Sequence, residues 1–287
     1  MALRGKSKFY FGGVDFYGVA QRMIKLPRDI PTQGERITLA YVKRLRQLLL
    51  RQIRLYRHHM VEGPLFLDDD NAYFVVEATN KDYTNLFEYQ QRKGKFVMLN
   101  LVNQMLYAKW KNALNELWRQ NKRYPTRPYE HRAKQLMKTE IEIHGALSKN
   151  KSRITNIKTV LLHGKTKDVS IAAMLCHWTP KEDGDIPNLL ASLVLHPNHI
   201  IRNNASRSLL VNYPDHLPEI DIQKFLAQVQ LPFHMDRNKA LYILVHYSRL
   251  PRYKKVLRRY KRCFHEWSKK TMQNIAQPAR EILNNIS

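Results

Sequence analysis

A repeated spacing in the second half of the chain constrains the fold more than any other feature of the sequence. Each of three segments has an alanine three positions after a residue near the start of a predicted helix. The pairs start 32 and 35 positions apart, and they are Ser170 with Ala173, Arg202 with Ala205 and Arg237 with Ala240. A small residue lets neighbouring helices approach closely, and helix pairs of this kind bury their apolar faces only by stacking. The spacing therefore predicts stacked helix pairs.

This pattern resembles HEAT repeats, in which the second helix begins after a turn with Asp or Asn, then Val-Arg, then Ala and Leu at helical spacing. The residues that carry it are Ile201, Arg202, Ala205 and Leu209, followed by Asp236, Arg237, Ala240 and Leu244. The segment at Asp168 lacks the arginine. The resemblance covers residues 166–250 and implies an all-α fold, an α-solenoid of stacked antiparallel helix pairs. It also implies structural contacts for Arg202 and Arg237, so neither is a candidate for ligand binding.

Composition agrees with a helical fold, because 10 Gly in 287 residues is low against an average of roughly 7%. Two short N-terminal β-hairpins are the expected exceptions. The first is predicted in residues 9–17 about Gly12-Gly13, since glycines tolerate the positive φ of tight turns. The second is predicted in residues 64–79, where apolar runs flank the turn-like sequence Asp-Asp-Asp-Asn.

Three regions are predicted along the chain. Residues 1–150 form a basic, mostly helical region, residues 151–248 contain the HEAT-like repeats, and residues 249–287 form basic aromatic helices that cap the solenoid. The helical patterns of the first region cover residues 33–60, 82–92, 95–122 and 127–147, and residues 148–153 are the predicted linker. A stripe with period three or four marks the buried side of the third helix: Phe96, Leu99, Val102, Leu106, Trp110, Leu114 and Leu117.

The positive charge of the chain is unevenly distributed. The formal net charge is +25, yet residues 166–247 carry seven Lys and Arg against eight Asp and Glu. A net charge of this size indicates the kind of binding partner more than the fold. The commonest partner of such a basic chain is the phosphate backbone of a nucleic acid. The sequence thus predicts a near-neutral scaffold joined to basic helices.

Two basic segments supply the candidate nucleic-acid-binding residues. The helix predicted over residues 33–60 has an apolar arc opposite a basic arc, and no acid occurs between Arg36 and Glu62. Residues 249–262 hold eight basic residues in fourteen, with no acid. The candidates are Arg44, Arg51 and Arg54 in the first segment, and Arg252, Lys254, Lys255, Arg258, Arg259, Lys261 and Arg262 in the second. The alternative for each segment is a solvated face over a packed core.

Aromatic residues accompany the second basic segment. Tyr253, Tyr260 and Trp267 repeat every seven residues. If the helix after Pro251 is continuous, Arg252 shares one face with three further cations, namely Lys255, Arg259 and Arg262. Such rings stack on unpaired bases in some proteins, and here they serve equally well as a cap on the core of the solenoid.

Sequence motifs for catalysis, metals and cofactors are missing. The glycines at residues 13–18 lack the lysine of a P-loop, and the Asp-rich turn at residues 68–71 lacks the glycine and glutamate of a calcium loop. Cys176 and Cys263 have no ligand spacing and are expected to be reduced. No cofactor or metal is expected. With no apolar run of 18 residues and no secretion signal, we expect a cytoplasmic protein, with mitochondrial or nuclear locations as alternatives.

The sequence thus predicts a non-enzymatic protein that binds RNA or DNA by phosphate contacts. The leading alternative is a HEAT-like scaffold for an acidic protein partner, and an anionic membrane surface is a further one. A lesser alternative is a HEAT-like glycosylase for alkylated DNA bases, in which Trp178 would work near Asp183 and Asp185. The choice between RNA and DNA and the oligomeric state stay open.

Overall fold

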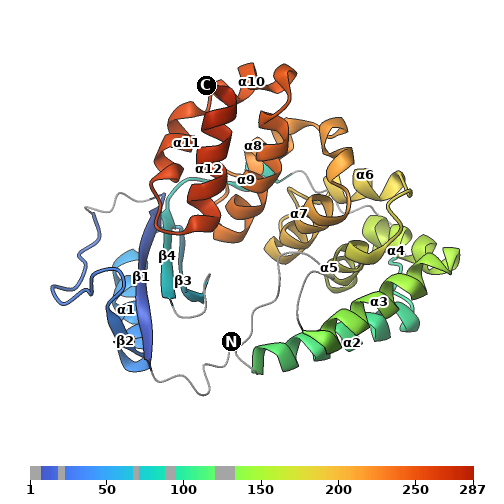
Figure 1. Ribbon diagram of the computed structural model, residues 1–287, viewed down its shortest axis with the longest axis horizontal. Helices are drawn as coiled ribbons and strands as arrows, with labels where there is room; N and C mark the ends of the chain where they lie inside the picture. Colours follow the sequence, from blue (N-terminus) through green and yellow to red (C-terminus); the bar gives the residue numbers. More distant parts are fainter. Residues whose placement is uncertain (1–7, 19–22, 67–70, 88–94, 120–132) are drawn as a thin grey trace. The chain divides into compact units, whose positions relative to one another are not determined.

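The computed structural model describes residues 8–18, 23–66, 71–87, 95–119 and 133–287 (Figure 1). It is mainly helical, as predicted, and also contains one mixed β-sheet. The chain forms two compact units. Residues 84–228 form the helical unit, and the residues before 84 together with residues 229–287 form the sheet unit. The ranges 1–150, 151–248 and 249–287 come from sequence pattern alone and stay a prediction.

The sheet unit is built from two distant stretches of the chain. The first supplies β1 (Lys8–Tyr17), β2 (Arg36–Thr38), α1 (Leu39–Ile53), β3 (His58–Phe66) and β4 (Asn71–Thr79). The second supplies α9 (His234–Ser248), α10 (Pro251–Arg258), α11 (Lys261–Ser268) and α12 (Gln273–Ile286). The strands lie in the order β2-β1-β4-β3, with β1 parallel to β4 and the other pairs antiparallel.

One face of the sheet is apolar and packs against α1. Side chains alternate between the two faces of a strand, and Phe74, Val76 and Ala78 of β4 point to the same buried cluster as Leu45 and Leu49 of α1. The Thr38 hydroxyl accepts a hydrogen bond from the backbone N–H of Tyr41 and so caps the first turn of α1. The apolar arc recognised in the sequence is therefore the side of α1 that covers the sheet.

The first predicted hairpin is wrong. Residues 8–17 form the single strand β1, which pairs with β4 from Tyr10 to Tyr17 and shifts register between Phe11 and Gly13. Gly13 has a φ of 127°, so its positive φ serves this irregularity and not a turn. At Gly12 a Cβ atom would lie 2.7 Å from the ring of Tyr73. The glycine pair lets β1 bend and lie close to its neighbours.

The second hairpin is confirmed, because β3 and β4 pair antiparallel. Its turn, residues 67–70, lies outside the described residues. The strand β3 begins at His58, inside the helix predicted over residues 33–60, and that helix is confirmed only from Leu39 to Ile53. Leu55, which helical periodicity alone would place on the apolar arc, is 87% exposed. The strands β2 and β3 thus take the place of helix at the two ends of the predicted segment.

The helical unit consists of short helices connected by tight turns. Its elements are η2 (Thr84–Leu86), α2 (Leu101–Arg119), α3 (Lys134–Ser148), α4 (Lys151–His163), α5 (Thr166–Leu175), η3 (Cys176–Trp178), α6 (Asp185–Ala191), α7 (His199–Asn212), η4 (Pro214–Glu219) and α8 (Ile222–Gln228). Consecutive helices pack in pairs, α2 with α3, α4 with α5 and α6 with α7. In addition, α5 packs against α7 and α4 against α6 (Figure 1). These contacts agree with stacked pairs, and the solenoid stays a prediction.

Polar side chains of α7 bind the backbone of the preceding pair at regular intervals. Asn204 donates to the carbonyl of Ser170, and the Ser208 hydroxyl donates to the carbonyl of Ala173. One turn later, Asn212 donates to the carbonyl of Cys176. The spacing of four residues places all three donors on one face of α7. This row of hydrogen bonds fixes α7 against α5 and η3.

Other helix boundaries differ from the predicted ones. Residues 82–92 contain only the short η2 in their described part, and residues 88–94 lie outside the description. The helices predicted over residues 95–122 and 127–147 are observed as α2 and α3, and residues 120–132 are not described. The predicted linker, residues 148–153, is a tight connection between α3 and α4. In the predicted stripe, Leu99, Trp110, Leu114 and Leu117 are buried, whereas Phe96 and Val102 are exposed.

Arg202 and Arg237 have matching backbone contacts. The guanidinium of Arg202 donates to the carbonyl of His196 at 2.6 Å, and that of Arg237 donates to the carbonyl of Leu231 at 2.9 Å. In both cases the acceptor lies six residues earlier in the chain. The paired alanines, Ala205 and Ala240, are fully buried. Both arginines are buried, which agrees with the structural role that the resemblance implied.

Candidate nucleic-acid interface

The C-terminal basic segment forms two helices and not one. α10 begins at Pro251, which suits the first helical position, and ends at Arg258. α11 begins at Lys261, so the helix is interrupted at residues 259–260. This break allows Leu257 of α10 and Phe264 of α11 both to be fully buried. The predicted single face through Arg252, Lys255, Arg259 and Arg262 is therefore not continuous.

The break leaves the cations of this segment on the surface of two adjoining helices. Lys254 is half-buried, and the other six candidates are exposed: Arg252, Lys255, Arg258, Arg259, Lys261 and Arg262. α10 packs against α9 and α12, and α11 packs against α12. The apolar sides of both helices are thus taken up by packing, which directs their basic sides to solvent.

Acidic neighbours neutralise only part of this surface. Arg262 pairs with Glu266 at 3.5 Å. The neighbouring Arg249 pairs with Glu281 at 2.6 Å. The Arg258 guanidinium donates to the carbonyl of Ile286. Four cations form no salt bridge among the described residues: Lys254, Lys255, Arg259 and Lys261. We call these four the free cations of α10 and α11.

Lys261 also lines a pocket that the sequence did not indicate. The pocket is about 280 Å³, lies between α11 and α12, and brings Lys261 together with His265 and Arg280. Arg280 is held in place, because its guanidinium donates to the carbonyl of Ser268 and to the side chain of Gln273. Three groups able to donate hydrogen bonds to an anion therefore converge on one hollow. Arg280 follows the basic segment by 18 residues, so no local charge pattern connected it to Lys261.

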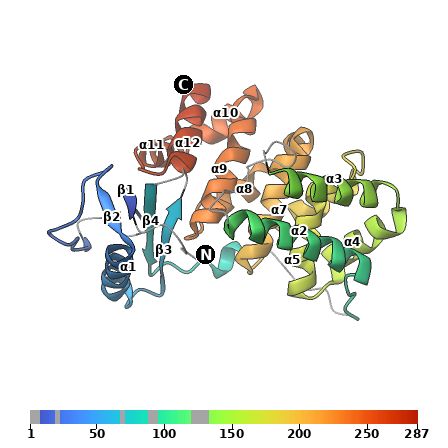
Figure 2. The ribbon, with the colours of Figure 1, turned by 60° about the horizontal axis from the view of Figure 1, so that its bottom comes forward.

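The α1 candidates lie on a separate surface. Arg44, Arg51 and Arg54 are all exposed, and Arg44 pairs with Asp29 at 3.1 Å. α1 contacts the strands, whereas α10 contacts α9 and α12. Figures 1 and 2 both show α1 and α10 well apart. The ten predicted residues therefore form two surfaces, and the larger one lies on α10 and α11.

The three aromatic residues of the basic segment have different surroundings. Tyr253 is half-buried and packs in a T-shaped contact against the buried Tyr247, with ring centroids 4.9 Å apart. Tyr260 lies in the break between α10 and α11. Trp267 is half-buried and packs edge-on against Phe264, with centroids 5.7 Å apart. The interrupted helix separates the rings that a continuous helix would have aligned.

The sheet face opposite α1 carries buried charges, which sequence reasoning missed. In the register of the strands, Tyr17 lies opposite Glu77 and Glu62 lies opposite Val75, so all of them share this face. The carboxylate of Glu77, only 2% exposed, accepts a hydrogen bond from Arg237 of α9 at 3.1 Å. The Arg237 guanidinium also lies 3.9 Å from the centre of the Tyr17 ring.

Burial dominates the electrostatics of this charged face. Loss of hydration raises the pKa of Glu77 to about 8 from an ordinary value of 4.5, although Arg237 opposes the shift. Burial and the nearby carboxylate of Asp236 also raise the pKa of Glu62. His234 shows the opposite change, since burial, reinforced by Arg237, lowers its pKa to about 3 from 6.5. Each shift favours the uncharged form of its group.

These shifts predict a pH-dependent stability of the sheet unit. Between pH 4.5 and 8 folded Glu77 binds a proton that the unfolded chain releases, so stability falls as pH rises. His234 acts in the opposite sense between pH 3 and 6.5 and contributes nothing above that range. From pH 6.5 to 8 we therefore expect the free energy of unfolding to fall by up to about 2 kcal/mol. Urea unfolding across this range measures the decline.

The matched variant for this pH effect is Glu77→Gln, which keeps an acceptor oxygen for Arg237 and removes the titrating proton. Its stability is expected to change less than that of the native chain between pH 6.5 and 8. Lys270, Asp15 and Asp236 surround the same face and are present in both proteins. An equal decline in both would show that other groups cause the pH dependence.

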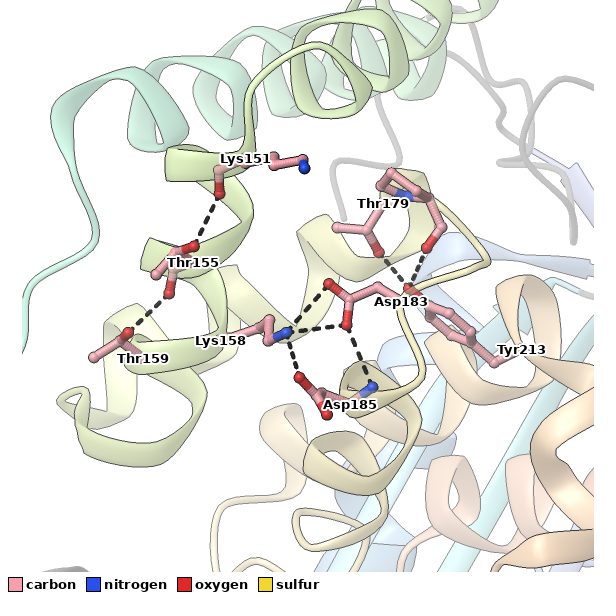
Figure 3. Close-up of polar contacts among 9 residues, drawn as sticks. Lys151, Thr155, Lys158, Thr159, Thr179, Asp183, Asp185 and Tyr213 are labelled. Atoms are coloured by element: carbon pink, nitrogen blue, oxygen red, sulfur yellow. Dashed lines mark hydrogen bonds and ion pairs between the residues drawn. The ribbon is translucent and has the colours of Figure 1, made fainter.

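The residues proposed for a glycosylase have structural partners instead. The Lys158 amine binds Asp183 at 3.1 Å and Asp185 at 2.5 Å, which ties α4 to the loop before α6 (Figure 3). In the same view, the Tyr213 hydroxyl contacts the Thr179 hydroxyl at 2.6 Å. Trp178 is 0% exposed, so its ring is unavailable for stacking on an extruded base. This arrangement does not support the glycosylase alternative.

Comparison with known proteins adds no relationship: the sequence matches no family model and no curated protein. Within the described ranges, no three His, Cys, Asp or Glu side chains gather as metal ligands. Cys176 and Cys263 are both free thiols. None of the helices in the described part of the chain is long and apolar enough to cross a membrane.

Proposed function

We propose that this chain binds nucleic acid without catalysis, by contacts between α10–α11 and the phosphate backbone. The observation that carries the proposal is the set of free cations, Lys254, Lys255, Arg259 and Lys261, on two adjoining helices. Cations that are already paired with carboxylates have little to gain from phosphate. Unpaired ones gain affinity from it, because binding releases the counterions condensed on nucleic acid.

The anchored arginines support the same proposal. Arg258 and Arg280 are oriented by backbone carbonyls, so each can meet a phosphate without first losing all of its rotamer freedom. The pocket shared by Lys261 and Arg280 offers one defined position for a phosphate group. The HEAT-like helical stack would then act as the scaffold, since residues 166–247 carry almost no net charge.

Anisotropy titrations of labelled single-stranded RNA, duplex RNA and duplex DNA test the proposal. Over about 50 to 300 mM salt we expect a steep loss of affinity, because phosphate contacts are screened and counterion release is suppressed. Binding that is absent at the lowest salt would refute the proposal. The three substrates together also rank RNA against DNA.

Charge reversal on α10 is the sharper test. The double variant Lys255→Glu and Arg259→Glu is expected to weaken binding by about 10- to 100-fold at low salt and to reduce the salt slope by about two. The matched control reverses two exposed lysines of the near-neutral region, Lys167→Glu and Lys181→Glu, and is expected to change affinity less than about threefold. Equal losses in both variants would indicate a net-charge effect and contradict a defined interface.

A protein scaffold remains the second candidate, and one observation favours it. Near the start of α2, several apolar side chains are exposed in a short stretch: Phe96, Met98, Leu101, Val102 and Met105. Leu101 alone is 70% exposed. Contiguous apolar surface of this kind is typical of protein contacts. Association through α2 would be insensitive to salt, which distinguishes it from binding through α10 and α11.

A further inference from the structure

A second pocket lies where the basic surface meets the sheet. It is about 560 Å³, within the range of pockets that hold small organic ligands. The end of β1 forms one wall with Phe16 and Tyr17, and the connection from α11 to α12 forms the other with Trp267, Lys269 and Lys270. All of these residues belong to the sheet unit.

The walls of this pocket are firmly held. The Lys270 amine donates to the carbonyl of Phe16 at 2.7 Å and lies 4.7 Å from the centre of the Tyr17 ring. The Asp15 carboxylate accepts hydrogen bonds from the backbone N–H groups of Thr271 and Met272. These contacts join the strand to the helix connection on both sides of the hollow, so the pocket does not depend on a single side chain.

Aromatic and polar groups are combined in the lining. Trp267 is half-buried and makes a T-shaped contact with Phe264, so its ring is only partly covered. The buried hydroxyl of Thr271 has no hydrogen-bond partner among the described residues. Buried polar atoms without partners are uncommon in folded proteins and accompany binding sites. The exposed amine of Lys269 lies at the same pocket.

The pocket and the cationic surface are joined by α11. Lys261 and His265 lie on its side toward α12, and Trp267 lies at its C-terminal end. A helix of eight residues spans about 12 Å, so a strand along α11 could meet both sites. In a duplex the bases are stacked and paired, which keeps them from entering a lateral pocket, whereas an unpaired base can turn out and stack on an aromatic ring.

We propose that the pocket beside Trp267 binds one unpaired nucleobase of a single strand whose phosphates lie on α10 and α11. This inference rests on the proposed phosphate binding and adds the preference for single strands. Trp267 stacks on the base, and Lys269 contacts the adjoining phosphate. The carboxylate of Glu266, which lines the pocket and also pairs with Arg262, accepts from an amino group of the base.

The test compares Trp267→Ala with Trp267→Phe and with the double variant Lys255→Glu and Arg259→Glu. Trp267→Ala is expected to weaken binding of a single-stranded oligonucleotide by about 5- to 150-fold and to leave duplex binding within about twofold. Trp267→Phe should retain most of the affinity, because it keeps a ring and the contact with Phe264. Urea unfolding of each variant verifies that the fold is intact.

A second measurement needs no variant. An oligonucleotide with 2-aminopurine at successive positions should lose fluorescence on binding at one position, where the base stacks on Trp267. Loss of fluorescence at no position, or an equal effect of Trp267→Ala on single strands and duplexes, would overturn the base pocket. A free mononucleotide that binds as tightly as the strand would also overturn it.

These outcomes separate the two proposals. If Trp267→Ala has no effect while the charge-reversal variant weakens every substrate, the base pocket fails and phosphate binding stands. If the charge-reversal variant weakens nothing, phosphate binding itself fails, and the base pocket falls with it.

Discussion

Replacing Arg237 with methionine should destabilise the sheet unit by about 3–5 kcal/mol. The guanidinium is the cation that hydrogen-bonds to buried Glu77, and it also donates to the carbonyl of Leu231. Removing the guanidinium takes the hydrogen-bond donor away from two buried acceptors, the Glu77 carboxyl and the Leu231 carbonyl, and the full desolvation cost of both groups then remains. Glu62 would add to the cost, since its raised pKa shows that it too is poorly solvated.

Amide hydrogen exchange is the measurement for this variant, because it shows which strands and helices lose stability. Faster exchange is expected in β1 and β4, where Tyr17 and Glu77 contact the guanidinium. The matched control is Arg202→Met, which removes the equivalent arginine from the helical unit and should loosen α7 instead. Adding Glu77→Gln to Arg237→Met should recover part of the stability. Unchanged exchange in β4 would contradict a stabilising role for the pair.

Asp15→Ala is the second variant with a large expected effect, about 2–4 kcal/mol. The Asp15 carboxylate accepts from the N–H groups of Thr271 and Met272 at 2.9 and 3.0 Å, directly before α12 begins. Asp15, on a distant strand, therefore accepts the hydrogen bonds that the side chain of an N-cap residue usually accepts. Its negative charge also interacts favourably with the N-terminus of the helix. Alanine would leave two N–H donors without acceptors, and that of Met272 is buried.

Thermal unfolding followed by circular dichroism measures this loss, and exchange in residues 273–286 assigns it to α12. Asp15→Asn keeps an acceptor oxygen and loses only the charge, so it is expected to cost clearly less. If asparagine proves as damaging as alanine, the charge matters more than the hydrogen bonds. A stable Asp15→Ala protein would contradict the capping role altogether.

Local pattern was enough to predict some parts of this fold. The basic and apolar arcs of residues 39–53 follow directly from helical periodicity, and the apolar runs around residues 67–70 correctly indicated paired strands. Failures occurred where pairing partners were distant. His58 to Met60 continue the helical pattern of α1, yet they pair with Glu77 to Thr79 of β4. Nothing within ten residues of His58 encodes that choice.

The candidate site shows the same limit. The basic character of α10 was plain from its sequence, but which cations stay unpaired depends on Glu266 and Glu281, whose positions follow from helix packing. The charged sheet face was missed because Asp15, Tyr17 and Glu77 alternate with apolar residues, as on any strand with one side in water. That α9 and the connection before α12 contact this side follows only from hydrogen bonds between residues more than 150 positions apart.

The order in which the sheet unit is synthesised gives its charged face a role before the fold is complete. During synthesis the four strands emerge well before residues 229–287, and the whole helical unit is made in between. An uncovered apolar face would be prone to aggregate during that interval. Before α9 is synthesised, this face presents the carboxyl groups of Asp15, Glu62 and Glu77 to water. Glu62 and Glu77, whose burial is unfavourable in the finished protein, would thus help to keep the uncovered sheet soluble until α9 is synthesised.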